Sequence, residues 1–377
     1  MTPQKVLIVG AGVAGPALAY WLTRHGFRTT IVERAKDLRS SGNPIDVKGP
    51  AVPVAERMGI MPRLREAATR VNAMTLLDPD GRPIARMAMP TGPSAGVELA
   101  RSDLSSVLYQ AARDDAEFLF DDTVAAVRPD AKGVDVTFGR ATPRRFDLVI
   151  GADGMHSTVR RLVFGSEREF ATDLGMFVAT VPLPPGAVEL PHDMVLHNTP
   201  GRLLSIHPGR DRPLALFVFR TPPVDGYDRH DTDLQKRIVA DAYAGVGWRA
   251  PELVETYRSH PSPFFDSLNR VRMPTWSRGR VALLGDAASS VALFGDGSSL
   301  AVAGAYTLAQ ALAANPGDHA RAFADYEKRH RRETDPRQRR IPPIVAAMIP
   351  RTRPGVAARN CTTRTLLRAS GRALRTA

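Results

Sequence analysis

The chain has 377 residues, of which 43% are hydrophobic, so it can bury a large core and is expected to form two domains. Its one cysteine, Cys361, excludes an internal disulfide and a metal site built on paired thiolates; we expect no metal and a reducing, cytoplasmic compartment. The N-terminus MTPQKVLIVG lacks the order of a signal peptide, and no apolar stretch approaches the roughly 20 residues of a transmembrane segment.

The formal net charge of +12 is concentrated at the end of the chain. From Arg321 onward there are 15 Arg and Lys against 4 Asp and Glu, and the apolar stretch IPPIVAAMIP interrupts them. Such a tail fits nucleic acid or an acidic membrane surface. We expect no nucleic acid, because a recognition motif and interleaved aromatic residues are missing. We favour helices that pack by an apolar side and expose arginines to solvent.

The first 34 residues predict a βαβ unit. KVLIVGAGVAGPALAYWLTRHGFRTTIVER gives an apolar strand over 6–9, a glycine turn, an amphipathic helix and a second strand over 29–32. Gly10 suits the tight turn, Gly12 allows the backbone to approach a pyrophosphate, and Gly15 allows the helix to pack on the strand. The pattern therefore predicts a Rossmann-type dinucleotide site, and it includes Ala14.

An acidic residue stands where such a site needs one. Glu33, about 20 residues after the glycines, is placed to accept hydrogen bonds from ribose hydroxyls, and Arg34 follows at once. NAD and FAD share this motif, so it does not decide between them.

Two later segments alternate polar and apolar residues. MTLLDPDGRPIARMAM predicts a hairpin across Asp80-Gly81, and LLSIHPGRDRPLALFVFR predicts another across Gly209 to Pro213. His192, His197 and His207 lie in this part of the chain, where a histidine in a strand is more often structural than catalytic. We nominate no catalytic residue.

Two further strands end in glycine and aspartate. FDLVIGADGMHSTVRR places Asp153 after a buried strand, with Ser157 or Thr158 as the cap of a following helix. GRVALLGDAASSVALFGDGSS places Asp286 after a strand over 281–284 and starts a long helix near Ser298. Asp286 suits the hydroxyls of a ribityl chain. Gly297 and Ser298 suit the edge of a flavin ring that becomes negative on reduction.

Four segments together resemble the motifs of the class A FAD-dependent monooxygenases. They are GAGVAG with Glu33 and Arg34, ELARSDLSSVL, DLVIGADGMHSTVR and GRVALLGDAA. This family includes para-hydroxybenzoate hydroxylase and the tetracycline-inactivating enzymes. The resemblance implies an α/β fold: a three-layer Rossmann-type FAD-binding domain with an inserted β-sheet substrate domain and C-terminal helices. The expected FAD-binding domain comprises residues 1–70, 100–168 and 277–377, and the substrate domain residues 71–99 and 169–276.

The resemblance also implies site residues and a reaction. Arg101 is expected at the flavin's sugar and phosphate, Asp46 of SGNPIDVKG near the flavin, and Arg39 near the entering nicotinamide. NADH or NADPH reduces FAD, O₂ adds to the flavin C4a, and the hydroperoxide hydroxylates an aromatic or polyketide-like substrate. The implied partners are therefore a small molecule and O₂.

One stretch departs from the family pattern. After GDAA, Ser289 and Ser290 replace the usual histidine or aromatic residue and proline, and the loop is one residue short. This departure leaves open a flavoprotein-like protein with lost or non-oxidative activity. The basic tail leaves open a second alternative, a membrane-surface enzyme that uses this tail. The sequence does not give the oligomeric state.

Overall fold

The chain divides into two compact units. The computed structural model describes residues 3–38, 43–90, 92, 95–222, 224, 227–290 and 296–369, without side chains for 366–369. The first unit comprises Met1–Ala67, Gly96–Thr172 and Asn269–Arg339, and the second comprises Ala68–Ala95, Asp173–Leu268 and Arg340–Ala377. The boundaries before residue 340 lie within eight residues of those predicted from the sequence.

The first unit is built on a six-stranded sheet in the order β17-β18-β11-β1-β2-β7. Its five strands from β18 to β7 run parallel, and β17 is antiparallel to β18. The central strands are short runs of Val, Leu and Ile because helices and a second sheet cover both faces. The strands are β1 (Lys5–Val9), β2 (Arg28–Val32), β7 (Glu117–Leu119), β11 (Leu148–Gly151), β17 (Ser277–Arg278) and β18 (Val281–Leu283).

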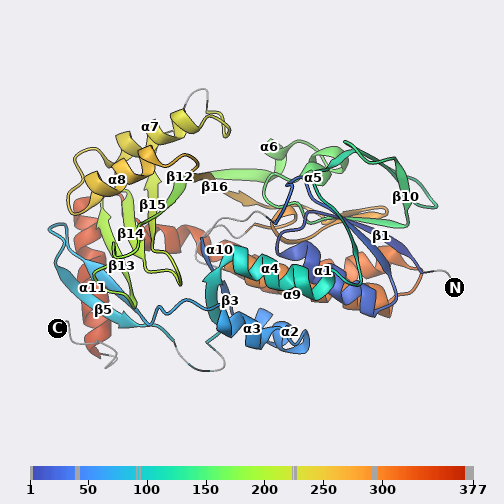
Figure 1. Cartoon of the computed structure of the whole chain (residues 1–377), viewed down its shortest axis with the longest axis horizontal. Coiled ribbons are helices and arrows are strands. Elements are labelled where there is room, and N and C mark those ends of the chain that lie inside the picture. The colour runs from blue at the N-terminus through green and yellow to red at the C-terminus, as the bar shows by residue number, and fades with distance from the viewer. Residues whose placement is uncertain are drawn as a thin grey trace. The chain divides into compact units, whose positions relative to one another are not determined.

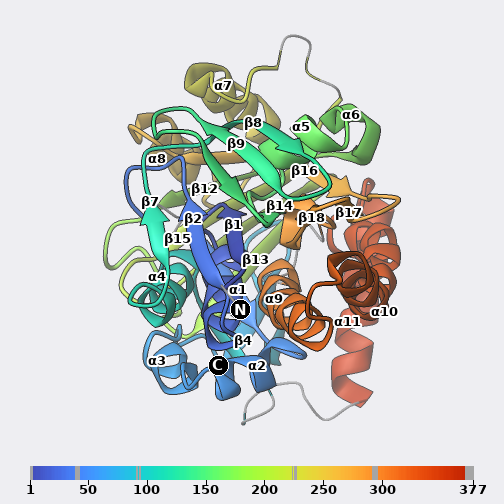
Figure 2. The same cartoon turned by 90° about the vertical axis from the view of Figure 1, so that its right-hand side faces the viewer.

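This sheet is the middle of three layers (Figure 2). Helices α1 (Ala14–Arg24), α4 (Arg101–Ala112) and α9 (Asp296–Ala314) cover one face, with α1 between the other two. A three-stranded antiparallel sheet of β8 (Val124–Pro129), β9 (Val134–Phe138) and β10 (Arg144–Phe146) covers the other. The expected three-layer α/β architecture is confirmed.

Shorter elements complete this unit. Strands β3 (Pro44–Val47) and β6 (Val97–Ala100) form an antiparallel pair that joins segments about 50 residues apart in the sequence. The remaining elements are α2 (Ala51–Arg57), α3 (Met61–Glu66), α5 (Thr158–Val163), α6 (Glu167–Phe170) and the 3₁₀ turn η1 (Gly285–Ala287).

The second unit is a seven-stranded sheet in the order β16-β12-β15-β14-β13-β4-β5. Helices α7 (Thr232–Tyr243) and α8 (Ala250–Ser259) run along one face of it (Figure 1), around a core that includes Phe217, Phe219 and Tyr257. Both predicted hairpins are present, as β4–β5 and β14–β15. The strands are β4 (Ala73–Leu77), β5 (Pro83–Ala88), β12 (Ala171–Pro182), β13 (Asp193–Thr199), β14 (Arg202–His207), β15 (Leu214–Arg220) and β16 (Phe264–Val271).

The basic end of the chain forms two helices, α10 (His319–Met348) and α11 (Arg353–Ala369). Their apolar residues Ile341, Val345 and Val356 are buried, as is Ile349 between the two helices, whereas arginines such as Arg340 are exposed. The sequence predicts residues 277–377 in the first unit, but the structure groups Arg340–Ala377 with the second because α11 packs beside β5 and β13. Among the helices of the described ranges, none is long and apolar enough to cross a bilayer.

Candidate functional site

The glycine loop after β1 brings three chain segments into close contact. Gly10 has φ +105°, and a Cβ there would lie 2.6 Å from the carbonyl oxygen of Ala152, at the end of β11. A Cβ on Gly15 would lie 2.0 Å from the carbonyl oxygen of Gly10, so helix α1 can approach the strand only without a side chain. Ala14, the first residue of α1, is buried.

Gly12 differs from Gly10 and Gly15 in its surroundings. A Cβ built on Gly12 would meet no protein atom within 4 Å, so the fold does not require glycine at this position. A backbone that must be approached closely by a ligand does require it. The open space above Gly12, at the start of α1, fits a pyrophosphate that binds to backbone N–H groups and the helix dipole.

Glu33 links this loop to the end of β2. Its carboxylate accepts hydrogen bonds from the backbone N–H of Ala11 at 2.8 Å and of Ala35 at 3.0 Å. Each bond uses a different oxygen, and every carboxylate oxygen has a second lone pair for a ligand hydroxyl. Arg34 is exposed beside it.

Asp153 lies beyond the carboxyl end of β11, as the sequence predicts, but its carboxylate already has partners. It accepts hydrogen bonds from the Ser157 hydroxyl and from the backbone N–H groups of Thr158 and Val159, the latter two at 2.6 and 3.1 Å. Burial raises the pKa of Asp153, and these donors oppose that shift. The side chain therefore caps α5, and only the adjacent backbone, which touches Gly10, reaches the glycine loop.

The turn that contains Asp286 lies between two helices. Gly285 has φ +64°, and a Cβ there would lie 3.3 Å from the Cβ of Ala14 in α1 and 3.6 Å from that of Ala301 in α9. Asp286 is partly exposed at this junction. The residues after β1 and after β18 therefore border the same region.

A fully buried arginine supports this turn. The Arg160 guanidinium donates to the carbonyl oxygen of Ala287 at 3.0 Å and to that of Met155, and so connects the segment after β11 to η1. The sequence shows two adjacent arginines, Arg160 and Arg161, in this short helix and does not indicate that Arg160 is the buried one or that its partner is Ala287.

The start of α9 is bonded to β3. The hydroxyls of Ser298 and Ser299 donate to the carbonyl oxygen of Asp46 at 2.7 and 2.9 Å, and Gly297 lies in the same helical turn. Arg101, exposed at the start of α4, donates its backbone N–H to the carbonyl oxygen of Asn43, just before β3.

Two of the predicted features fall outside the described residues. These are Arg39 and positions 291–295 of the shortened loop.

The histidines of the second unit have structural partners. His197 is buried against Trp248, with a ring-centroid distance of 5.3 Å, and its Nε2 lies 3.2 Å from the carbonyl oxygen of Pro79. The Nδ1 of His207 accepts the backbone N–H of Gly209. Within the described ranges, no group of three His, Cys, Asp or Glu side chains could hold a metal ion.

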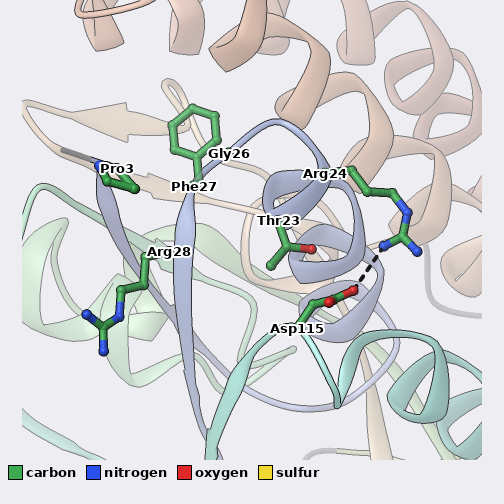
Figure 3. Close-up of a pocket in the computed structure, with 7 residues that line it drawn as sticks. All are labelled: Pro3, Thr23, Arg24, Gly26, Phe27, Arg28 and Asp115. Carbon is green, nitrogen blue, oxygen red and sulfur yellow. Dashed lines mark ion pairs between the residues drawn. The ribbon is translucent and has the colours of Figure 1, made fainter. Parts of the chain in front are cut away.

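A shallow pocket lies at the opposite end of the parallel strands (Figure 3). It is near the amino ends of β1 and β2, and an Arg24–Asp115 ion pair of 3.6 Å crosses it. Doubly wound sheets bind ligands at the carboxyl ends of their strands, where Gly12 and Glu33 lie, so this pocket is separate from the candidate site. It is lined by Pro3, Thr23, Arg24, Gly26, Phe27, Arg28 and Asp115.

Comparison with known proteins identifies the nucleotide. Residues 4–334 match the family model described as an FAD binding domain. The chain belongs to this FAD-binding family. A flavin-dependent monooxygenase of Legionella longbeachae is 32% identical over 344 residues, which cover 89% of this chain and 87% of its own. An uncharacterised protein of Mycobacterium tuberculosis is 41% identical over 330 residues, 86% of this chain and 88% of its own.

Solved structures agree with this assignment. This FAD-binding family member superposes on the tetracycline destructase Tet(55) with a TM-score of 0.85 and 29% identity, over 99% of this chain and 98% of the other. Tet(51) gives a TM-score of 0.83 and 30% identity over the whole of both chains. The protein thus belongs to the class A flavin-dependent monooxygenases, the family predicted from the motifs.

Proposed function

We propose that this protein uses FAD and consumes NADH or NADPH to insert one atom of O₂ into an aromatic or polyketide-like small molecule. The observation that carries the proposal is the contact between segments far apart in the sequence. Gly10 touches the end of β11, Gly285 touches Ala14 and α9, and α9 is bonded to β3 through Ser298. These contacts form one connected border, along which an extended dinucleotide would lie.

The proposed roles follow along this border. The N–H groups after Gly12 bind the pyrophosphate, Glu33 accepts from the ribose, and Asp286 accepts from the ribityl chain. The start of α9, at Gly297 and Ser298, lies at the isoalloxazine ring, where its positive dipole stabilises negative charge. Arg101, Asp46 and Arg39 keep the roles that the family resemblance implies. Bound FAD supplies the redox chemistry, and the protein supplies position, charge and exclusion of water.

The second unit is the proposed substrate domain. It holds a seven-stranded sheet and a buried core that includes Phe217, Phe219 and Tyr257. The tetracycline destructases, at 29% and 30% identity, favour a polycyclic polyketide over a simple phenol.

The test is reconstitution with FAD followed by a substrate screen. We expect the purified protein to be yellow and Asp286→Ala to lose most of its flavin absorption. The matched control is Asp211→Ala, which removes a carboxylate that is 86% exposed in the second unit. Phenols and polyketides, tetracyclines included, are then screened for faster NADH or NADPH oxidation by the yellow protein.

Two results would contradict this proposal. A colourless protein that takes up no added FAD would end it. A yellow protein whose flavin is reduced by neither NADH nor NADPH would favour the non-oxidative alternative raised by Ser289 and Ser290.

A further inference from the structure

A network of charged side chains lies where β3, α9 and α10 meet in the first unit. The Nζ of Lys48 is 2.8 Å from Asp46 Oδ2 and 3.4 Å from Asp296 Oδ1. On the other side of Asp296, Arg337 lies 4.0 Å away and also pairs with Glu333 at 2.8 Å. Lys48 is thus shared by two carboxylates from segments 250 residues apart.

The backbone of Lys48 is held as well. Its N–H donates to the hydroxyl of Ser299 at 3.0 Å, and that hydroxyl in turn donates to the carbonyl oxygen of Asp46. On the opposite side a Cβ on Gly96 would lie 2.8 Å from the Cβ of Lys48 and 2.5 Å from the carbonyl oxygen of Val47. Gly96, the residue before β6, therefore lies directly against the backbone of Val47 and Lys48, which leaves Lys48 little freedom to shift.

The Lys48 ammonium balances the negative charge of the carboxylates around it. Burial raises the pKa of Asp46, the Lys48 ammonium opposes this, and Glu98 and Asp296 add further negative potential. Burial lowers the pKa of Lys48, but the hydrogen bond and charge of Asp46 outweigh it, so the ammonium is retained at neutral pH. Among the ion pairs of the described residues, removing the ammonium would leave Asp296 with Arg337 at 4.0 Å and Asp46 with no cation.

We propose that Lys48 is a positioning residue that fixes the first turn of α9 to β3 and balances the carboxylates at the flavin-ring end of the site. This rests on the proposed function, in which the start of α9 lies at the isoalloxazine ring. Flavin reduction adds negative charge there, so an unbalanced carboxylate nearby disfavours the reduced form. Lys48 acts on the flavin through α9 and through local potential, without a bond to the substrate.

The experiment compares Lys48→Met with Lys48→Arg, and uses Lys36→Met at an exposed lysine as the control. FAD affinity is measured by the quenching of flavin fluorescence, and the midpoint potential by equilibration with a reference dye. In Lys48→Met we expect the affinity for oxidised FAD to fall about tenfold. The affinity for reduced FAD should fall about tenfold more than the affinity for oxidised FAD, which lowers the two-electron midpoint potential by about 30 mV. Lys48→Arg and Lys36→Met should stay near wild type.

A double variant separates charge from packing. Lys48→Met with Asp296→Asn restores the net charge, so its midpoint potential should return toward the wild-type value. If Lys48→Met does not fold, the comparison is made with Lys48→Gln. Wild-type affinity and potential in Lys48→Met would overturn the inference, as would a potential that the double variant does not restore. Failure of the wild type itself to bind FAD would instead contradict the proposed function.

Discussion

Protonation of His330 is expected to destabilise the first unit between pH 7 and pH 5. His330 lies on α10 and is 3% exposed, with its ring centroid 5.9 Å from those of Trp276 and Tyr326. Burial lowers its pKa from 6.5 to about 4, although a hydrogen bond to the backbone of Leu300 partly opposes the shift. The folded state therefore binds this proton less readily than the unfolded state.

The sign and size of the effect follow from linkage. Because the folded pKa is depressed, the stabilisation is present above pH 6.5 and is lost as the pH falls toward 4. The full shift corresponds to about 3 kcal/mol in the free energy of unfolding, of which about 2 kcal/mol is lost by pH 5.

The assay is urea unfolding at pH 7, 6 and 5 with the same excess of FAD in every sample, since a ligand of the folded state adds stability. Replacing Trp21 and Trp248 by Phe leaves Trp276, next to His330, as the fluorescence reporter. In this background His330→Gln cannot titrate. Between pH 7 and pH 5, the free energy of unfolding of His330→Gln should fall by about 2 kcal/mol less than that of the parent.

Two results would refute this reasoning. One is an equal loss of stability in the parent and in His330→Gln. The other is a His330 pKa near 6.5 from NMR titration of the folded protein, which would mean that water or a charge partner reaches the ring.

The other predictions concern two glycines and a buried hydroxyl. Gly12→Ala should fold normally, within about 0.5 kcal/mol, because its Cβ meets no protein atom within 4 Å, but should lose on the order of 100-fold in FAD affinity. Gly15→Ala should instead lose about 3 kcal/mol or more of stability, since its Cβ would lie 2.0 Å from a carbonyl oxygen; normal stability there would contradict the packing. Tyr243→Phe should cost about 1–2 kcal/mol, measured by urea unfolding with Trp248 fluorescence, because the buried Tyr243 hydroxyl donates to Leu203 at 2.7 Å.

Local patterns in the sequence were sufficient for much of the backbone. The first strand is predicted over 6–9 and is observed as Lys5–Val9, because an apolar run followed by glycine has few alternatives. The long helix is predicted near Ser298 and begins at Asp296. The turn at Asp80-Gly81 forms because Gly81 supplies φ +82° between two alternating strands.

The partners of individual side chains could not be predicted in the same way. The sequence places Asp153 at a strand end, but only the structure shows that its carboxylate is taken up by the start of α5. Nothing in the sequence pairs Lys48 with Asp296, because the carboxylate of Asp296 stands 248 positions later. The tail was assigned to the first unit because nothing in its sequence marks the change of unit after Arg339 inside a continuous helix.

The order of strands in the parallel sheet has a consequence for biosynthesis. Neighbours β1, β11 and β18 come from Lys5–Val9, Leu148–Gly151 and Val281–Leu283, so the nucleotide cradle stays incomplete until three quarters of the chain has left the ribosome. At roughly 5–20 residues per second, the time between the synthesis of β1 and that of β18 is on the order of 15–60 s. During that interval the nascent chain exposes an unpaired apolar strand edge, the kind of surface that favours aggregation and that chaperones bind.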